Sequence, residues 1–292
     1  MNKPDDPNNL RCPGCGVRGL NPTETYLVKY GFSIIRCRHC ALRFIANRDA
    51  EKIDNLYLAF HQKGGYYDVR YNENDPRRGP TFERWLDIIE RIKPTGKLLD
   101  IGAAYGEFLR RAARRERWNL SGVEIDPEAA RQAGIAAKSN VRSGRIEEQT
   151  FNRHYFDIIT AFELIEHLPD PRNTIMQIYE WLKPEGIFCV STPNLNKLKN
   201  RISRRGRENF YIPPEHLLYF NRRALRILLE SLGFKKLLID AGIKSLLHKL
   251  NLYSDGKQSS VITKSLEACL RSGQWLGIEG FQIFAVFQKT RT

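Results

Sequence analysis

Leu98-Leu99-Asp100-Ile101-Gly102-Ala103-Ala104-Tyr105-Gly106 is an apolar run that ends in a turn containing two glycines. The run predicts a β-strand and a tight turn, because glycine adopts the positive φ angles of such turns at little steric cost. A helix is expected next, from Glu107 to Arg117, and a second strand then ends in Gly122-Val123-Glu124-Ile125-Asp126. This is the layout of a nucleoside site: the backbone of the turn can approach a ligand, and Glu124 can accept hydrogen bonds from both ribose hydroxyls.

The turn favours S-adenosylmethionine over a dinucleotide as the ligand. A dinucleotide fingerprint requires G-x-G-x-x-G with the pyrophosphate on a helix N-terminus, and Ala104 replaces the middle glycine here. Asp100 precedes the first glycine, and its carboxylate would repel a pyrophosphate but suits an amino group or a sulfonium. The alternative is a tight strand-to-helix turn that binds no ligand.

The segment resembles motif I of the class I S-adenosylmethionine-dependent methyltransferases, usually D-x-G-x-G-x-G. The resemblance implies an α/β, Rossmann-like fold with a seven-stranded, mostly parallel sheet and helices on both faces. It also implies cofactor contacts at Asp100, Gly102, Ala104, Gly106, Glu124, Ile125, Ile146, Glu147 and Phe162. Of these, Ile146 and Glu147 match the loop that brackets the adenine in this superfamily; a solvated acidic loop is the alternative.

Composition sets the broad class. A chain of 292 residues can bury one large core and carry a small appended module. Its hydrophobic content is 41%, and no apolar run approaches the roughly 20 residues that span a bilayer. The polar stretch Met1–Asn9 is unlike a signal peptide, so we expect a cytoplasmic protein. The net charge of +14 favours an anionic partner, namely nucleic acid, an acidic membrane surface or a phosphorylated substrate.

Two C-x-x-C pairs near the start of the chain predict a zinc ribbon. They are Cys12-Pro-Gly-Cys15 and Cys37-Arg-His-Cys40, and each is placed on a turn so that four thiolates can converge on one tetrahedral ion. A site with only cysteine ligands is structural rather than catalytic. A module this short has little core, so the metal would supply folding free energy. Disulfides are the alternative, which a cytosolic environment disfavours.

Strands and helices alternate from Gly96 onward, which predicts a parallel sheet covered on both faces. The expected strands are Lys97–Ile101, Leu120–Glu124, Lys138–Arg142, Phe156–Ala161, Gly186–Ser191, Phe234–Ile239 and Phe281–Lys289. The expected helices are Pro127–Ala133, Pro171–Leu182 and Arg222–Leu232. We divide the chain into a zinc-ribbon module (1–48), a helical linker region (49–93) and a methyltransferase domain (94–292). In the linker region, helical spacing runs over Asp49–His61 and over Thr81–Ile92, with Thr81 as an N-cap.

A second group of polar residues follows the strand that ends near Ala161. Glu163, Glu166 and His167 are spaced by three and four residues, which would place them on one side of a helical turn. They emerge at the carboxyl end of a parallel strand, where open α/β sheets bind their ligands. Carboxylates and an imidazole together suit a divalent ion or a general base.

This group resembles the E-x-x-E-H segment of the ubiquinone-biosynthesis O-methyltransferases and of the small-RNA 3′-terminal 2′-O-methyltransferases. The resemblance implies that Glu163, Glu166 and His167 hold a divalent ion such as Mg²⁺, which gathers the substrate hydroxyls. In the RNA enzymes a further histidine downstream completes the site, and His216 in Pro213-Pro214-Glu215-His216 is the candidate here. The alternatives need no metal: the polar groups cap a helix and bind substrate, or His167 acts directly as a base.

Two basic runs complete the inventory of charged features. One comprises Lys197, Lys199, Arg201, Arg204, Arg205 and Arg207, and the other comprises Arg110, Arg111, Arg114, Arg115 and Arg117. Such runs are usually solvated faces; the functional alternative is binding of a substrate phosphate or of an anionic leaflet.

A zinc ribbon ahead of a methyltransferase core resembles bacterial enzymes associated with surface-glycan and secondary-metabolite pathways. That implies O-methylation of a sugar, a lipid-linked sugar or another small-molecule hydroxyl, with peripheral contact to an anionic membrane surface left open. The runner-up is an RNA 2′-O-methyltransferase, favoured by the charge and by His216 but lacking a separate RNA-binding domain. The third reading is a non-catalytic zinc-ribbon binding protein with a degenerate fold, which the intact set of Asp100, Gly102, Glu124 and Glu163–His167 disfavours.

Overall fold

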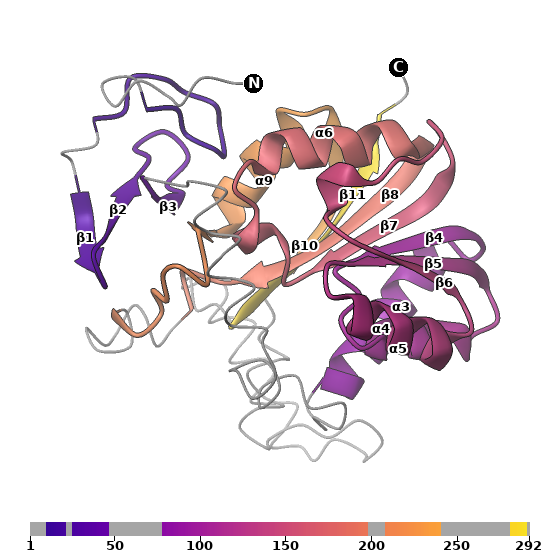
Figure 1. Ribbon diagram of the computed structural model, residues 1–292. Helices are drawn as coiled ribbons and strands as arrows, with labels where there is room; N and C mark the ends of the chain where they lie inside the picture. Colours follow the sequence, from indigo (N-terminus) through magenta and orange to yellow (C-terminus); the bar gives the residue numbers. More distant parts are fainter. Residues whose placement is uncertain (1–9, 22–24, 47–77, 198–207, 241–280, 291–292) are drawn as a thin grey trace, which may run out of the picture.

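The computed structural model describes residues 10–21, 25–46, 78–197, 208–240 and 281–290 (Figure 1). The expected helix Asp49–His61 lies outside the described residues, as do the connection 241–280 and most of the first basic run. None of the helices in the described part of the chain is long and apolar enough to cross a membrane.

The central sheet has seven strands and confirms the predicted fold class. They are β4 (Gly96–Ile101), β5 (Trp118–Glu124), β6 (Asn140–Ser143), β7 (Phe156–Phe162), β8 (Leu182–Pro193), β10 (Phe234–Asp240) and β11 (Gln282–Lys289). Their order across the sheet is β10-β11-β8-β7-β4-β5-β6, and β11 alone runs antiparallel to its neighbours. Since β4 has β5 on one side and β7 on the other, its carboxyl end is a topological switch point, where such sheets bind ligands.

Helices cover both faces of this sheet (Figure 1). They are α3 (Arg78–Ile92), α4 (Glu107–Ala113), α5 (Pro127–Ala137), α6 (Pro171–Trp181) and α9 (Arg222–Glu230). Side chains alternate along β4: Leu98 packs in a core cluster with α3, α4 and α5, whereas Leu99 packs in another cluster with α6 and α9. The sheet therefore has two apolar cores, one on each face.

Several helix boundaries differ from those expected. The helix α5 continues to Ala137 instead of ending at Ala133, and α9 ends at Glu230 instead of Leu232. Thr81 does not cap α3, because the helix already begins at Arg78. Pro80 sits in the first turn of that helix, where its missing N–H removes no intrahelical hydrogen bond. The helix after the glycine turn ends at Ala113 instead of Arg117. It could not have continued to Arg117, because Glu116 has a positive φ of 52°, which is incompatible with a right-handed helix.

A smaller sheet joins the cysteine-rich module to the rest of the chain. It contains β1 (Thr25–Lys29), β2 (Phe32–Arg36), β3 (Arg43–Ile45) and β9 (Leu218–Tyr219), in that order. The strand β9 comes from the methyltransferase part of the chain and pairs antiparallel with β3. Side chains of both parts also share one hydrophobic core, in which Leu42 and Phe44 lie in the same cluster as Leu217 and Phe220.

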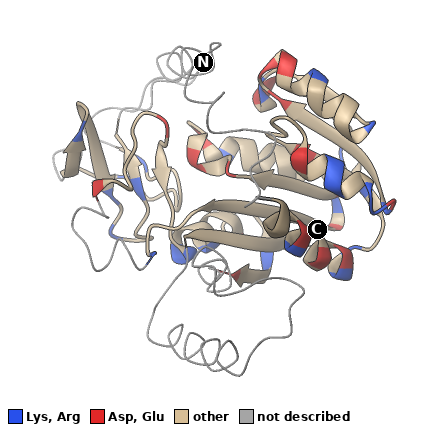
Figure 2. Cartoon of the chain, turned by 90° about the horizontal axis from the view of Figure 1, so that it is seen from below, with Lys and Arg blue, Asp and Glu red and all other residues tan. Residues whose placement is uncertain are grey.

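The arginine run, which begins on α4 and continues just beyond its end, faces acidic residues of α3. Arg111 Nη1 lies 2.8 Å from Glu83 Oε1, and Arg115 Nη2 lies 2.7 Å from Glu83 Oε2. Arg117 pairs with Glu90 at 3.1 Å. Figure 2 likewise shows basic and acidic residues interspersed on the helices. These ion pairs join α3 to α4 and to the turn that follows α4.

Candidate active site

The glycine turn after β4 keeps its shape although alanine replaces the middle glycine. Gly102, Ala104 and Gly106 all have positive φ angles, of 75°, 47° and 80°. The left-handed conformation costs a non-glycine residue roughly 1–2 kcal/mol, which a small residue held by its neighbours can tolerate. At Gly106 a side chain is excluded for a second reason: a Cβ there would lie 2.6 Å from Cα of Ala133 in α5.

Glu124, at the tip of β5, holds that turn in place. Its Oε2 accepts a hydrogen bond from the Ala104 N–H at 2.7 Å, and its Oε1 accepts one from the Asp126 N–H at 3.2 Å. Burial raises the pKa of Glu124 above its ordinary value. Each carboxylate oxygen has a second lone pair, so the pair of ribose hydroxyls expected from the sequence can still be accepted.

Asp100 lies at the end of β4 and is only 3% exposed. Its Oδ1 accepts a hydrogen bond from Thr160 Oγ1 on β7 at 2.6 Å. Burial raises the pKa of Asp100 to about 7, and the nearby charge of Glu124 acts in the same direction. A cation beside this carboxyl would favour its ionised form, which fits the amino or sulfonium group expected there.

The other residues expected to contact the cofactor differ in their surroundings. Ile125 is half-buried beside Glu124, and Ile146 is buried at the start of the 3₁₀ turn η1 (Ile146–Glu148). Glu147 Oε1 accepts a hydrogen bond from Thr174 Oγ1 on α6 at 3.0 Å, so this carboxylate ties η1 to a helix. The Phe162 ring lies in an aromatic cluster, 4.7 Å from the ring of Trp85 on α3.

Three of the four expected acceptor-side residues come together. Ligand atoms of Glu166, His167 and His216 all lie within 4.8 Å of one another. Glu166 is 1% exposed, and neither of its carboxylate oxygens has a hydrogen-bond partner among the described residues. Burial, together with the charge of Glu163, raises the pKa of Glu166 well above its ordinary value. A buried, unpartnered carboxylate beside two imidazoles is a donor set that suits a divalent ion.

His167 is held in a defined orientation in the 3₁₀ turn η2 (Ile165–His167). Its Nδ1 lies 2.6 Å from the carbonyl oxygen of Glu215. Because a carbonyl oxygen can only accept, Nδ1 carries a proton, so in the neutral ring the lone pair is on Nε2. That Nε2 lies 3.9 Å from Oε1 of Glu166. The neutral ring can therefore accept a proton or bind a metal through Nε2.

Glu163 differs from the regular helical turn expected for this segment. It has a positive φ of 51°, and the helical geometry begins only at Ile165. Its Oε1 accepts a hydrogen bond from Ser191 Oγ on β8 at 2.9 Å. Glu163 thus leaves β7 in a turned conformation beside Glu166, rather than on the same face of a helix.

Sequence reasoning missed two positioning residues, Thr160 and Ser191. Both are polar residues in the buried interiors of strands β7 and β8, with 0% exposure. A buried hydroxyl normally requires a hydrogen-bond partner, so a polar residue within an otherwise apolar strand was the available signal. Here the partners are Asp100 for Thr160 and Glu163 for Ser191.

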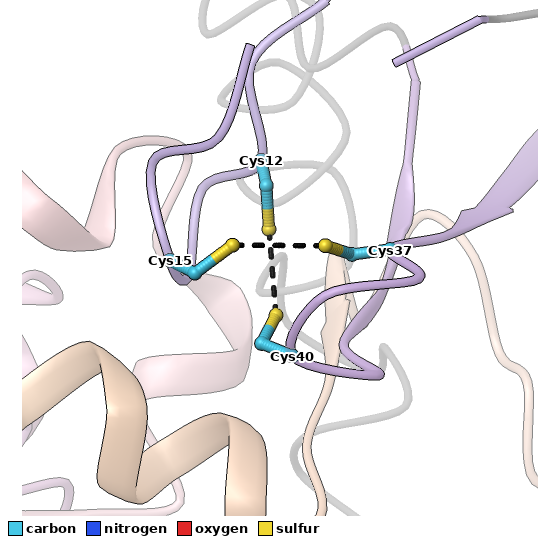
Figure 3. Close-up of side chains that lie close together, drawn as sticks. All are labelled: Cys12, Cys15, Cys37 and Cys40. Atoms are coloured by element: carbon cyan, nitrogen blue, oxygen red, sulfur yellow. Dashed lines mark hydrogen bonds between the residues drawn. The ribbon is translucent and has the colours of Figure 1, made fainter. Parts of the chain in front are cut away.

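The four N-terminal cysteines converge on one point (Figure 3). The Sγ atoms of Cys12 and Cys40 lie 3.6 Å apart, as do those of Cys15 and Cys37. These separations exclude disulfides, in which the sulfurs are about 2.0 Å apart. A tetrahedral zinc ion with sulfur at about 2.3 Å separates its ligands by about 3.8 Å, so the site has the dimensions of a zinc site.

The sheet order, the reversed strand β11 and the acid-bearing glycine turn at the switch point together define a nucleoside-binding α/β fold of the methyltransferase type. A family model described as "Methyltransferase domain" matches residues 76–239, more than half of the chain. The chain therefore belongs to this methyltransferase family, and the predicted resemblance is confirmed.

Several curated relatives match parts of the chain, among them an O-methyltransferase and a probable S-adenosylmethionine-dependent methyltransferase. The ubiquinone biosynthesis O-methyltransferase of Cronobacter sakazakii is 30% identical over 106 residues, which are 34% of this chain and 43% of that protein. A probable S-adenosylmethionine-dependent methyltransferase of Mycolicibacterium smegmatis is 29% identical over 138 residues, 46% of this chain and 49% of that protein. The chain thus spans less than half the length of each of these two relatives.

Solved structures share the fold. A SAM-dependent methyltransferase from Archaeoglobus fulgidus matches with a TM-score of 0.55 and 22% identity, covering 77% of this chain and 100% of that one. Phosphoethanolamine N-methyltransferase 2 of Haemonchus contortus, solved with S-adenosyl-L-methionine, matches with a TM-score of 0.53 and 18% identity, covering 72% and 53%. At these identities the likeness concerns the fold alone.

Proposed function

We propose that the protein transfers the methyl group of S-adenosylmethionine to a hydroxyl group of a small polar acceptor. The observation that carries this proposal is the position of the Glu166, His167 and His216 cluster relative to Asp100. Glu166 and His167 of this cluster follow β7, the strand that pairs directly with β4 through Asp100 and Thr160. A cofactor on the glycine turn and an acceptor at the cluster would therefore occupy the carboxyl ends of neighbouring strands.

In the proposed reaction, the acceptor oxygen attacks the methyl carbon, the sulfur–carbon bond breaks, and S-adenosylhomocysteine leaves. The sulfonium methyl is already activated, so the protein has to align the oxygen and remove its proton. His167 is suited to take that proton on Nε2, because its Nδ1–H bond to the Glu215 carbonyl fixes the tautomer. The same bond stays intact when the ring becomes an imidazolium.

Glu166, His167 and His216 would also hold a divalent ion, since their ligand atoms fit one. When bound, such an ion supplies a lower pKa for a coordinated hydroxyl. The metal reading and the direct-base reading make opposite predictions for chelation. If His167 is a direct base, activity persists when the divalent ion is removed and zinc is retained.

We further propose that the acceptor is a sugar, a lipid-linked sugar or another small hydroxyl compound. The Cronobacter relative is an O-methyltransferase, which supports oxygen as the methylated atom. Most of the arginine run that begins on α4 is paired with carboxylates, so it adds little to the case for RNA as the acceptor. The cysteine cluster is proposed to hold one structural zinc ion.

Two measurements test this function. Calorimetry should detect S-adenosylmethionine binding to the folded chain, and Glu124→Ala should weaken it. Transfer of a labelled methyl group should then be compared across nucleotide-linked sugars, lipid-linked sugars, phenols and RNA. His167→Ala should abolish transfer and leave cofactor affinity unchanged. Folded protein that binds no S-adenosylmethionine would remove the proposal, and transfer to RNA alone would replace the small-molecule acceptor.

A further inference from the structure

The cysteine-rich module is in direct contact with the segment that carries His216. The backbone N–H of Ile45, at the end of β3, donates to the carbonyl of Leu217 at 2.9 Å. The N–H of the same Leu217 donates to the carbonyl of Glu166 at 2.9 Å. Leu217 is thus hydrogen-bonded both to the cysteine-rich module and to Glu166. We call Glu166, His167 and His216 the acceptor cluster, because the proposed methyl acceptor binds there.

Two basic side chains of the module strengthen this contact. Lys29 Nζ donates to the backbone carbonyls of Glu208 at 2.7 Å and of Tyr211 at 2.6 Å. Arg43 Nη1 donates to the hydroxyl of Tyr211, and the Arg43 guanidinium also lies 3.9 Å from the ring centroid of Tyr26. Both side chains therefore act on the start of the segment that leads to His216.

Ring contacts continue from that point to the cluster. The rings of Tyr211 and Tyr219 lie 4.7 Å apart, and the ring of Tyr219 lies 6.3 Å from that of His216. The rings of His216 and His167 lie 4.9 Å apart. A continuous path of packed groups thus runs from Arg43 to both histidines.

The segment cannot hold this arrangement by itself. β9 contains two residues, and a strand of that length is ordered only by its neighbours. Its neighbour β3 directly follows the turn that carries Cys37 and Cys40. In this turn the backbone N–H of Cys37 donates to the carbonyl oxygen of Leu42 at 2.8 Å. The turn that carries Cys12 and Cys15 is also anchored to the helix α6, since Arg172 Nη1 donates to the carbonyl oxygen of Gly14 at 2.8 Å.

We propose that the zinc ribbon is the positioning element of the acceptor half of the site. Folded on its metal, it fixes β9 and thereby the Glu215 carbonyl, His216 and the backbone of Glu166. Lys29 and Arg43 are positioning residues that transmit this order. The cofactor half is held differently, by the bonds among Ala104, Glu124, Asp100 and Thr160. The ribbon is therefore needed for methyl transfer but not for cofactor binding; this catalytic consequence rests on the proposed function.

The test compares a Lys29→Met/Arg43→Met double variant with Arg18→Met, an exposed basic residue of the same module. Full chains are checked for zinc content, and backbone hydrogen exchange is measured with resolution at Leu217. In the double variant, exchange at Leu217 should rise about tenfold or more, while strands β4 and β5 keep their protection. S-adenosylmethionine affinity should stay within about twofold of wild type, and methyl transfer should fall in kcat. Arg18→Met should change none of these.

The outcomes separate this inference from the proposed function. Unchanged exchange at Leu217 in a double variant that retains zinc overturns the inference, and so does an equal loss of cofactor affinity. Faster exchange without a fall in kcat overturns its catalytic part. If the double variant loses zinc, Arg43→Lys, which keeps the charge but not the planar fork, is measured under the same criteria. A wild-type chain that transfers no methyl group contradicts the proposed function, while the exchange experiment still decides the positioning role.

Discussion

Affinity for S-adenosylmethionine should rise with pH through about 7, the value to which burial raises the pKa of Asp100. The buried acid has one strong hydrogen bond, from Thr160 at 2.6 Å, and its neighbour Glu124 opposes ionisation. A bound cation reverses this balance and favours the carboxylate. Binding at neutral pH is therefore expected to displace a proton from Asp100.

The size of the effect follows from the pKa. With a value of about 7, the carboxyl is about one-tenth ionised at pH 6 and nine-tenths ionised at pH 8, so affinity should differ by about tenfold. The amino group of the ligand also titrates near pH 8. The variant Asp100→Asn lacks the titration of Asp100, whereas the ligand's amino group titrates in both proteins. The ratio of the wild-type affinity to the variant's affinity at each pH therefore reports the effect of Asp100 alone.

Calorimetry in buffers of different ionisation enthalpy measures the displaced proton directly. At pH 7 the wild-type protein should release about half a proton per cofactor bound, and Asp100→Asn should release none from this position. Parallel affinity profiles for the two proteins between pH 6 and 8 would refute the reasoning.

The stability of the protein without cofactor gives a second check. A raised pKa in the folded state stabilises the fold below the ordinary value of 3.8, and this contribution is lost as the pH rises to about 7. Asp100→Asn should therefore be more stable than wild type at pH 8, by up to about 4 kcal/mol.

Three further perturbations have defined outcomes. Gly106→Ala should destabilise the protein by roughly 2 kcal/mol or more in denaturant titrations, because it adds a clash with Ala133 to an unfavourable φ; Gly31→Ala, with the same sign of φ but nothing within 4 Å, should cost only about 1 kcal/mol. Elemental analysis should find about one zinc per chain, and Cys37→Ser should lose it together with protection of the β2–β3 amides; full zinc occupancy in that variant contradicts the four-cysteine site. Arg115→Met should lower stability by about 1 kcal/mol in a salt-dependent manner and leave cofactor affinity unchanged; a weaker cofactor affinity would assign the arginine run a role in binding.

Much of the central sheet was predictable because its signals are local. Strands such as β4 and β7 are short apolar runs bounded by glycine or polar residues, and such runs can be recognised without knowledge of any partner. The acid at Glu124 and the turn at Gly102 could likewise be placed, since a strand, a turn and a helix fix their separation. The start of α3 was missed because Pro80 sits within the first turn of the helix.

The residues proposed to bind the methyl acceptor could be predicted from the sequence, but their arrangement in space could not. The spacing of Glu163, Glu166 and His167 suggested a helical face, yet the left-handed conformation of Glu163 directs its carboxylate to Ser191. That conformation depends on the neighbouring strand β8, which the local sequence does not specify. The role of the Glu215 carbonyl in orienting His167 was also outside the reach of a pattern, because backbone atoms carry no sequence signal.

By itself, the sequence determined the methyltransferase fold, the acid-bearing glycine turn and the four cysteines of the ribbon, since each depends on residue types at short, fixed spacings. Only the tertiary structure decided that the cysteine-rich module contacts the segment of the Glu166, His167 and His216 cluster. Their connection runs through β9, a two-residue strand with no periodic pattern, and through hydrogen bonds of Leu217 that any residue other than proline could make. Such contacts arise from packing between distant parts of the chain, so they become visible only when both parts are folded together.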